Sequence, residues 1–461
     1  MRSITRTSAR PGTSIALAVA LLCGTAIGAA AFESPAHAQD EKKAKPKLSK
    51  GFQKSYAGLA ELVNAEAPDE AAIRAGIPGL LQSVDTPDDR NFAGNLLLTV
   101  GSKFSDPALR LQGIDLMIES GQDNDRVGLL SYAKYQIHME QNNYDAARAS
   151  LIAAHDAGYS FEGRLADGTT SLVTSGDLRL MAAETYFEED RYAEGLADLK
   201  SWLESRAAAG QPIEERWIRR GFATAFNNQL GQQAADYAQM FLTHYPSTNV
   251  WADAVTVQTG FFDYDSQEVL DLMRLARRTG VLSGSRLADT SMAPDRLDLI
   301  KGSMIRFYLD YVEAADYRRL PGEVKNVLEE GIAAGVLSSG DVTIADTLSA
   351  ARGRINADRA DLPSLERDAR RSSSVNTVMA AGDAFLSYGE AAKAEEFFAK
   401  ALTMPGVDTP RIQMRLGIAQ ADQGKFAEAK TTFDAITGKR AQIASLWSIY
   451  AQNKMAGNAG A

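Results

Sequence analysis

The feature that most constrains this chain is an internal repeat in its last quarter. Placing Gly382 on Gly417, an offset of 35 residues, brings a set of identical residues into register. The other identical pairs at this offset are Ala384 with Ala419, Gly389 with Gly424, Ala392 with Ala427, Ala394 with Ala429, and Phe398 with Phe433. A period of this length indicates stacked supersecondary units, because each unit leaves an apolar face that its neighbour must cover.

Each unit predicts a pair of helices. A small residue lies on the first helix, a glycine marks the turn, and the second helix carries an alanine followed four residues later by a phenylalanine. Where the two helices cross, the small residue lets the backbones approach and the aromatic ring fills the groove. The segment from Ala441 to Met455 has apolar residues at helical spacing and suits the capping helix that ends such an array.

This pattern resembles the tetratricopeptide repeat. The resemblance rests on Gly382-x-x-Phe385 and Ala394-x-x-x-Phe398 in one unit, and on Leu416-Gly417 and Ala429-x-x-x-Phe433 in the next. Gln420 stands where an aromatic residue is expected, and neither unit has the tryptophan of the first helix. The resemblance implies an all-α chain folded as a right-handed α–α superhelix of helical hairpins, with a role in protein interaction.

Weaker signals extend this interpretation upstream. The spacing of the second helix recurs in Tyr144, Ala147 and Leu151, and again in Tyr192, Gly195 and Leu199. The intervening stretch 160–176 is rich in Gly, Ser and Thr and predicts a loop. Farther on, Pro321 opens a helix that ends near Gly335, and Asp341 caps the next one. No segment alternates like a strand, so no sheet is predicted.

We therefore expect five segments. They are a secretory signal peptide over 1–38, a Lys-rich linker over 39–55, a divergent helical-repeat region over 56–250, an irregular helical region over 251–372, and a C-terminal repeat pair with its capping helix over 373–461. The sequence leaves open whether 251–372 continues the array or forms a hinge.

The N-terminus predicts export. Arg2, Arg6 and Arg10 precede an uncharged apolar stretch that is followed by Ala36-His-Ala38, the order of a secretory signal peptide with cleavage after Ala38. The mature protein is then periplasmic or secreted. If the stretch stays uncut, it is long enough to act as a single N-terminal membrane anchor. The lysines between Lys42 and Lys54 predict a solvated linker, with weak contact to an anionic membrane or cell-wall polymer as the alternative.

Composition excludes several function classes. The formal charge of −10 makes nucleic acid a poor partner. The only cysteine, Cys23, lies in the predicted signal peptide, so the mature chain has neither a disulfide nor a thiol nucleophile. His138, His155 and His244 lack the spacing of metal ligands. We find no phosphate loop, nucleophile elbow or dinucleotide fingerprint, and therefore predict no catalytic residue, cofactor or metal.

One cluster predicts a partner-binding surface. Arg216, Trp217, Arg219 and Arg220 combine the residue types that dominate binding hot spots. The simpler interpretation, which the sequence favours, is that Trp217 packs in a hairpin core while the arginines reach water. The leading hypothesis is a non-catalytic periplasmic scaffold that binds protein or peptide partners in the cell envelope. The alternatives are an enzyme or enzyme subunit that acts on cell-wall material through residues in 251–371, and a module that self-assembles through its terminal faces.

Overall fold

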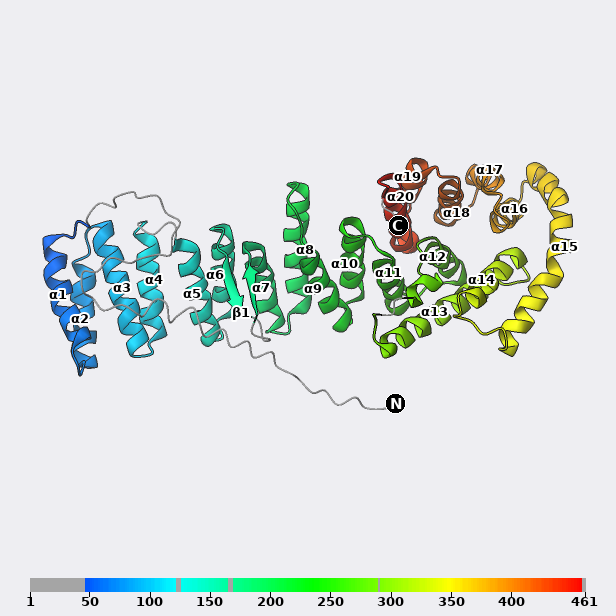
Figure 1. Ribbon diagram of the computed structural model, residues 1–461. Coiled ribbons are helices and arrows are strands. Elements are labelled where there is room, and N and C mark those ends of the chain that lie inside the picture. Colours follow the sequence, from blue (N-terminus) through cyan, green and yellow to red (C-terminus); the bar gives the residue numbers. More distant parts are fainter. Residues whose placement is uncertain (1–45, 122–125, 165–168, 289–290, 458–461) are drawn as a thin grey trace. The chain divides into compact units, whose positions relative to one another are not determined.

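The computed structural model describes residues 46–121, 126–164, 169–288 and 291–457 (Figure 1). The predicted signal peptide and cleavage position lie outside the described residues. The predicted linker over 39–55 overlaps α1 (Lys50–Asn64), whose N-cap Ser49 accepts a hydrogen bond from the backbone N–H of Phe52. Phe52 is fully buried, so regular structure begins within the lysine-rich segment.

The chain divides into two compact units, residues 1–199 and residues 200–461, with the division inside α8. The described part of the first unit contains α1, α2 (Glu70–Gln82), α3 (Pro87–Lys103), α4 (Pro107–Glu119), α5 (Val127–Glu140), α6 (Tyr144–Asp156), β1 (Phe161–Arg164), β2 (Thr170–Val173), α7 (Ser175–Phe187) and the start of α8 (Tyr192–Ala208). Short connections make consecutive helices pack against each other. Capping boxes at Thr86 and Thr174 fix where α3 and α7 begin.

The prediction that the chain contains no sheet was wrong. Within the stretch predicted as a loop, β1 and β2 form an antiparallel pair in which Phe161 lies opposite Val173. The Phe161 ring packs 4.8 Å from the ring of Tyr132, and Val173 joins the same apolar cluster. Strands of four residues are too short to show alternation in sequence, and these are held by side chains that pack on α5.

The second unit is an all-α stack. It contains the rest of α8, then α9 (Glu215–Asn227), α10 (Gly231–His244), α11 (Thr248–Phe261), α12 (Ser266–Arg278), α13 (Pro294–Ala315), α14 (Pro321–Ala333), α15 (Val342–Arg371), α16 (Val375–Ser387), α17 (Ala391–Leu402), α18 (Thr409–Asp422), α19 (Phe426–Asp434) and α20 (Ala441–Met455). The helices predicted to open at Pro321, to be capped by Asp341 and to span Ala441–Met455 are confirmed. The described chain is thus an all-α helical solenoid with one small hairpin.

The repeated hairpins share one packing contact. In α16/α17 and α18/α19, a Cβ added at Gly382 or Gly417 would lie 2.5 Å from the ring of Phe398 or Phe433. In α9/α10, Gly221 makes the same close approach to the ring of Tyr237. Every pair is separated by 16 positions. The first-helix glycine, together with the buried second-helix alanine, therefore makes room for the aromatic ring.

The turns between paired helices also repeat. Gly389 and Gly424 have φ values of 78° and 76° in the last two hairpins. Asn142, Asp190 and Gln229 occupy the corresponding turns upstream, with φ values of 56° to 60°. The same left-handed turn thus recurs without glycine, at a steric cost that Asn and Asp bear better than most residues.

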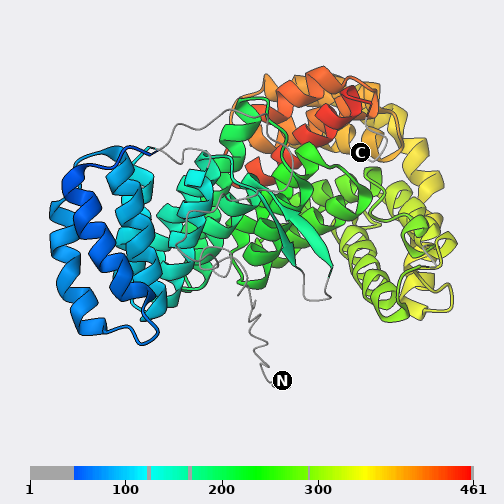
Figure 2. The ribbon, with the colours of Figure 1, turned by 60° about the vertical axis from the view of Figure 1, so that its left-hand side comes forward.

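The second unit closes on itself (Figures 1 and 2). In α20, Asn453 donates a hydrogen bond to the carbonyl of Leu242 on α10, and the indole N–H of Trp447 donates to the carbonyl of Asp271 on α12, each at 3.1 Å. Arg278 on α12 forms a two-pronged ion pair with Asp422 on α18, both contacts at 2.6 Å. Helices α11 to α15 therefore lead the chain from α10 round to repeats that pack back on it.

A buried ionic network lies at this closure. Arg274 on α12 is 1% exposed and pairs with both oxygens of Glu323 on α14, at 2.8 and 2.7 Å. Tyr311 donates a further hydrogen bond to Glu323 at 2.8 Å. Burial alone raises the pKa of Glu323, but the charge and hydrogen bonds of Arg274 outweigh it and bring that pKa below its ordinary value.

Asp271 forms the other half of the network. It is fully buried, with Arg415 Nε at 3.1 Å from one oxygen and Arg440 Nη1 at 3.3 Å from the other. Arg415 also lies 3.6 Å from the buried Asp383 of α16. Burial raises the pKa of Asp271 to about 7, against the opposing attraction of Arg274 and Arg440. Helix α12 is thus tied to α14, to α18 and to Arg440, which directly precedes α20.

Replacing Glu323 with Gln should lower the free energy of unfolding by about 3–5 kcal/mol, because Arg274 keeps its charge in a buried place and loses the carboxylate that pairs with it directly. Urea denaturation followed by circular dichroism measures the loss. The matched control is Glu330→Gln on the same helix, whose ion pair with Arg277 is solvent-exposed and should contribute no more than about 1 kcal/mol. Equal losses in the two variants would contradict the dependence on burial.

Candidate functional site

The four residues predicted to bind a partner differ in burial: Trp217 is buried, and the three arginines are exposed. Trp217 on α9 is 2% exposed and packs against the ring of Trp202, with the centroids 5.0 Å apart. The guanidinium of Arg206 lies 5.3 Å from the Trp217 ring. Trp217 therefore takes the packing role that the sequence favoured over partner binding.

The three arginines of this cluster are exposed on α9. Their spacing of three and four residues puts them on one helical face. Arg216 pairs with Glu214 at 2.7 Å, and Arg219 pairs with Glu215 while it lies 5.1 Å from the ring of Phe241. Partner binding at this face stays a prediction.

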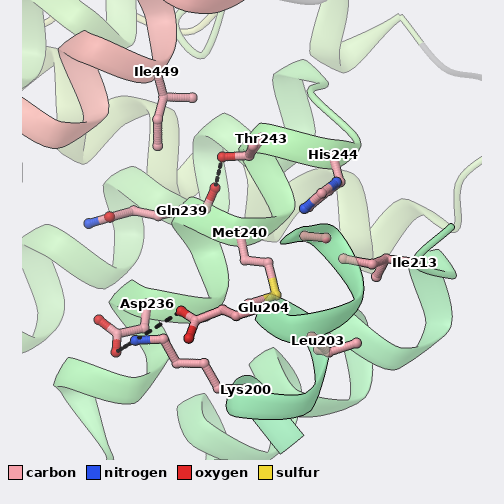
Figure 3. Close-up of a pocket in the computed structure, with 11 residues that line it drawn as sticks. Lys200, Leu203, Glu204, Ile213, Asp236, Gln239, Met240, Thr243, His244 and Ile449 are labelled. Carbon is pink, nitrogen blue, oxygen red and sulfur yellow. Dashed lines mark hydrogen bonds and ion pairs between the residues drawn. The ribbon is translucent and has the colours of Figure 1, made fainter. Parts of the chain in front are cut away.

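A pocket of about 280 Å³ lies nearby in the same unit (Figure 3). It is lined by α8, by the connection before α9, by α10 and by one residue of α20. The apolar lining residues are Leu203, Ala207, Ile213, Met240 and Ile449, and the polar ones are Lys200, Glu204, Asp236, Gln239, Thr243 and His244. Sequence reasoning missed this site, because its residues come from helices of different hairpins, α8, α10 and α20, and no local pattern marks where these helices meet.

The polar groups of the pocket gather on two sides (Figure 3). On one side, Lys200 Nζ lies 2.6 Å from Asp236 and 3.7 Å from Glu204, and the hydrogen bond to Asp236 raises the pKa of Lys200. On the other side, the hydroxyl of Thr243 donates to the carbonyl of Gln239 at 2.8 Å. Burial lowers the pKa of His244, so its ring is neutral at pH 7.

Helix α20 holds Ile449 over the pocket through contacts with α10. Gln442 on α20 accepts a hydrogen bond from Gln239 at 3.2 Å and donates one to Gln232 at 3.1 Å. Together with Asn453, these contacts fix α20 along α10. The side of the pocket formed by Ile449 is thus a product of the closure of the second unit.

The ammonium and hydroxyl groups that line the pocket are already engaged within the chain. The ammonium group is paired with two carboxylates, and the hydroxyl donates to a backbone carbonyl. Over the described ranges, no three His, Cys, Asp or Glu side chains come together as a metal site. No helix of the described chain has the length and apolar character needed to span a membrane.

Comparison with known proteins adds little. No protein-family model and no curated protein sequence matches the chain. A solved structure, the Cut9-Hcn1 hetero-tetramer of APC/C, is 14% identical with a TM-score of 0.22, over 84% of this chain and 67% of that chain. A structural similarity and a sequence identity this low do not bear on function. The tetratricopeptide pattern therefore remains a resemblance, carried by the hairpin packing described above.

Replacing Trp217 with Ala should lower the free energy of unfolding by about 3–5 kcal/mol, because it empties a space between α8 and α9. Changing Arg216 and Arg220 to Ala should alter it by no more than about 0.5 kcal/mol each, as expected for surface positions. Thermal and urea unfolding of the variants provide the measurement. A Trp217→Ala variant as stable as the parent would contradict the core placement.

Proposed function

We propose that this chain is a non-catalytic periplasmic scaffold that binds protein or peptide partners in the cell envelope. The observation that supports it best is the pocket between α8, α10 and α20, whose apolar lining is flanked by fixed polar groups. Stacked helix pairs commonly present such surfaces along their length. The signal-peptide pattern at residues 1–38 supports the location.

The openness of the pocket favours a protein partner over a small molecule. Sites for drug-sized ligands usually enclose most of the ligand. This pocket, of about 280 Å³, is instead open to the surface and would receive one or two side chains of a docked segment. Met240 and Ile449 would receive an apolar anchor, while Lys200 and Asp236 would meet polar groups beside it.

Site-specific photo-cross-linking in cells tests this proposal. A photo-reactive amino acid at Met240 should give discrete cross-linked proteins, and the same bands should appear from Thr243. The matched control is Ser201, an exposed residue on α8 outside the pocket, which should give none of them. Replacing Ile449, a partly exposed lining residue, with Arg should remove the bands. Bands equally strong from Ser201, or degradation of cell-wall material by the purified chain, would contradict the scaffold function.

The location has its own test. N-terminal sequencing of the protein recovered from a periplasmic fraction should begin at Gln39, because the small residues at Ala36 and Ala38 favour cleavage there. An Ala38→Asp variant should accumulate uncleaved in the membrane fraction. Recovery of the parent chain with residues 1–38 intact would instead support the single N-terminal anchor.

A further inference from the structure

Three arginines converge on one neutral oxygen in the second unit. Gln267 lies in the first turn of α12, and its side-chain oxygen Oε1 accepts from the Nη2 atoms of Arg319, Arg411 and Arg415 at 3.3, 3.2 and 3.1 Å. Arg319 belongs to the connection between α13 and α14, whereas Arg411 and Arg415 lie on α18. Closure of the unit therefore brings three separate segments to this point.

Two of these cations have no counter-charge in contact. Arg415 is fully buried and lies beside Asp271 and Asp383. Within the described residues, neither Arg319 nor Arg411 has a carboxylate within ion-pair distance, and the only side-chain acceptor for both is Gln267 Oε1. An amide oxygen has two lone pairs and no net charge, so it cannot satisfy three guanidinium groups. Their mutual repulsion remains in a partly buried place.

The chemistry of the cluster selects its ligand. Guanidinium groups bind planar carboxylates through paired hydrogen bonds, and a carboxylate offers about four acceptor positions where the amide oxygen offers two. The Nε2 of Gln267 forms no hydrogen bond with any described residue and can donate to a second ligand oxygen. Asp271 and Asp383 lie close enough to act on Arg411, so they disfavour a doubly charged phosphate more than a singly charged carboxylate.

We propose that Arg319, Arg411 and Gln267 form a binding site for a carboxylate of an acidic segment in a protein partner. The inference rests on the proposed scaffold function and deepens it, because it assigns a second, charge-selective contact apart from the apolar pocket. Arg411 is half-buried and Arg319 exposed, so the ligand reaches the cluster from the side of the α13–α14 connection.

The test uses the full mature chain and a short polyglutamate peptide, with binding measured by calorimetry at low salt. Changing Arg319 and Arg411 to Gln should weaken binding by about tenfold or more, because two charge-assisted contacts are lost. The matched control is Arg367→Gln with Arg371→Gln, which removes two exposed charges from α15 and should leave the affinity within about threefold. Equal loss in both double variants would overturn the site.

A second variant separates binding from folding. In the Gln267→Glu variant the chain's own carboxylate occupies the position proposed for the ligand. The variant should therefore have a higher unfolding temperature and should not bind the peptide. A chain with Gln267→Glu that is destabilised, or that still binds the peptide, would overturn the proposal. The proposal would also be overturned if inorganic phosphate stabilised the chain and the peptide did not, and if this stabilisation disappeared in the Arg319/Arg411 variant. If the peptide does not bind but the cross-links from Met240 are still formed, the arginine site is wrong and the proposed scaffold function is unaffected.

Discussion

The second unit depends on charges that its own helix α12 buries. Asp271 and Arg274 lie one turn apart on this helix, with almost no exposure to solvent. A buried charge without a partner costs several kcal/mol, so α12 can pack only where Glu323, Arg415 and Arg440 arrive from later in the chain. Hydrophobic residues in their place could stabilise the unit as well or better. What the ion pairs add is a requirement for one particular arrangement of α14, α18 and α20.

Both candidate binding sites follow from this closure. The contact of α20 with α10 brings Ile449 over the pocket, and the contact of α18 with α12 brings Arg411 to Gln267. Neither site exists within a single hairpin. The two sites also differ in chemistry, since one offers an apolar lining beside a neutralised lysine and the other offers unpaired guanidinium groups.

What the sequence revealed was local. Gly382, Phe398 and their counterparts recur because each hairpin needs the same small-to-large contact, and that contact spans only 16 positions. Upstream the repeat is harder to recognise because Asn142, Asp190 and Gln229 replace the turn glycine while they keep its backbone conformation. The network of α12 could not be foreseen, because a charged residue on a helix ordinarily lies at the surface. Its partners are separated by 49 positions for Arg274 and Glu323, and by 169 for Asp271 and Arg440.

The position of Gln267 links ligand binding to the stability of the unit. It lies one helical turn before Asp271, so the arginine cluster and the buried network share both α12 and Arg415. A ligand that binds only when α12, α18 and the α13–α14 connection are together stabilises that arrangement in proportion to its concentration above its dissociation constant. Opening the unit must then separate the ligand from at least one of its contacts. A partner held at the arginine cluster therefore also stabilises the packing of α18 on α12, the helix whose buried Asp271 pairs with Arg440 directly before α20.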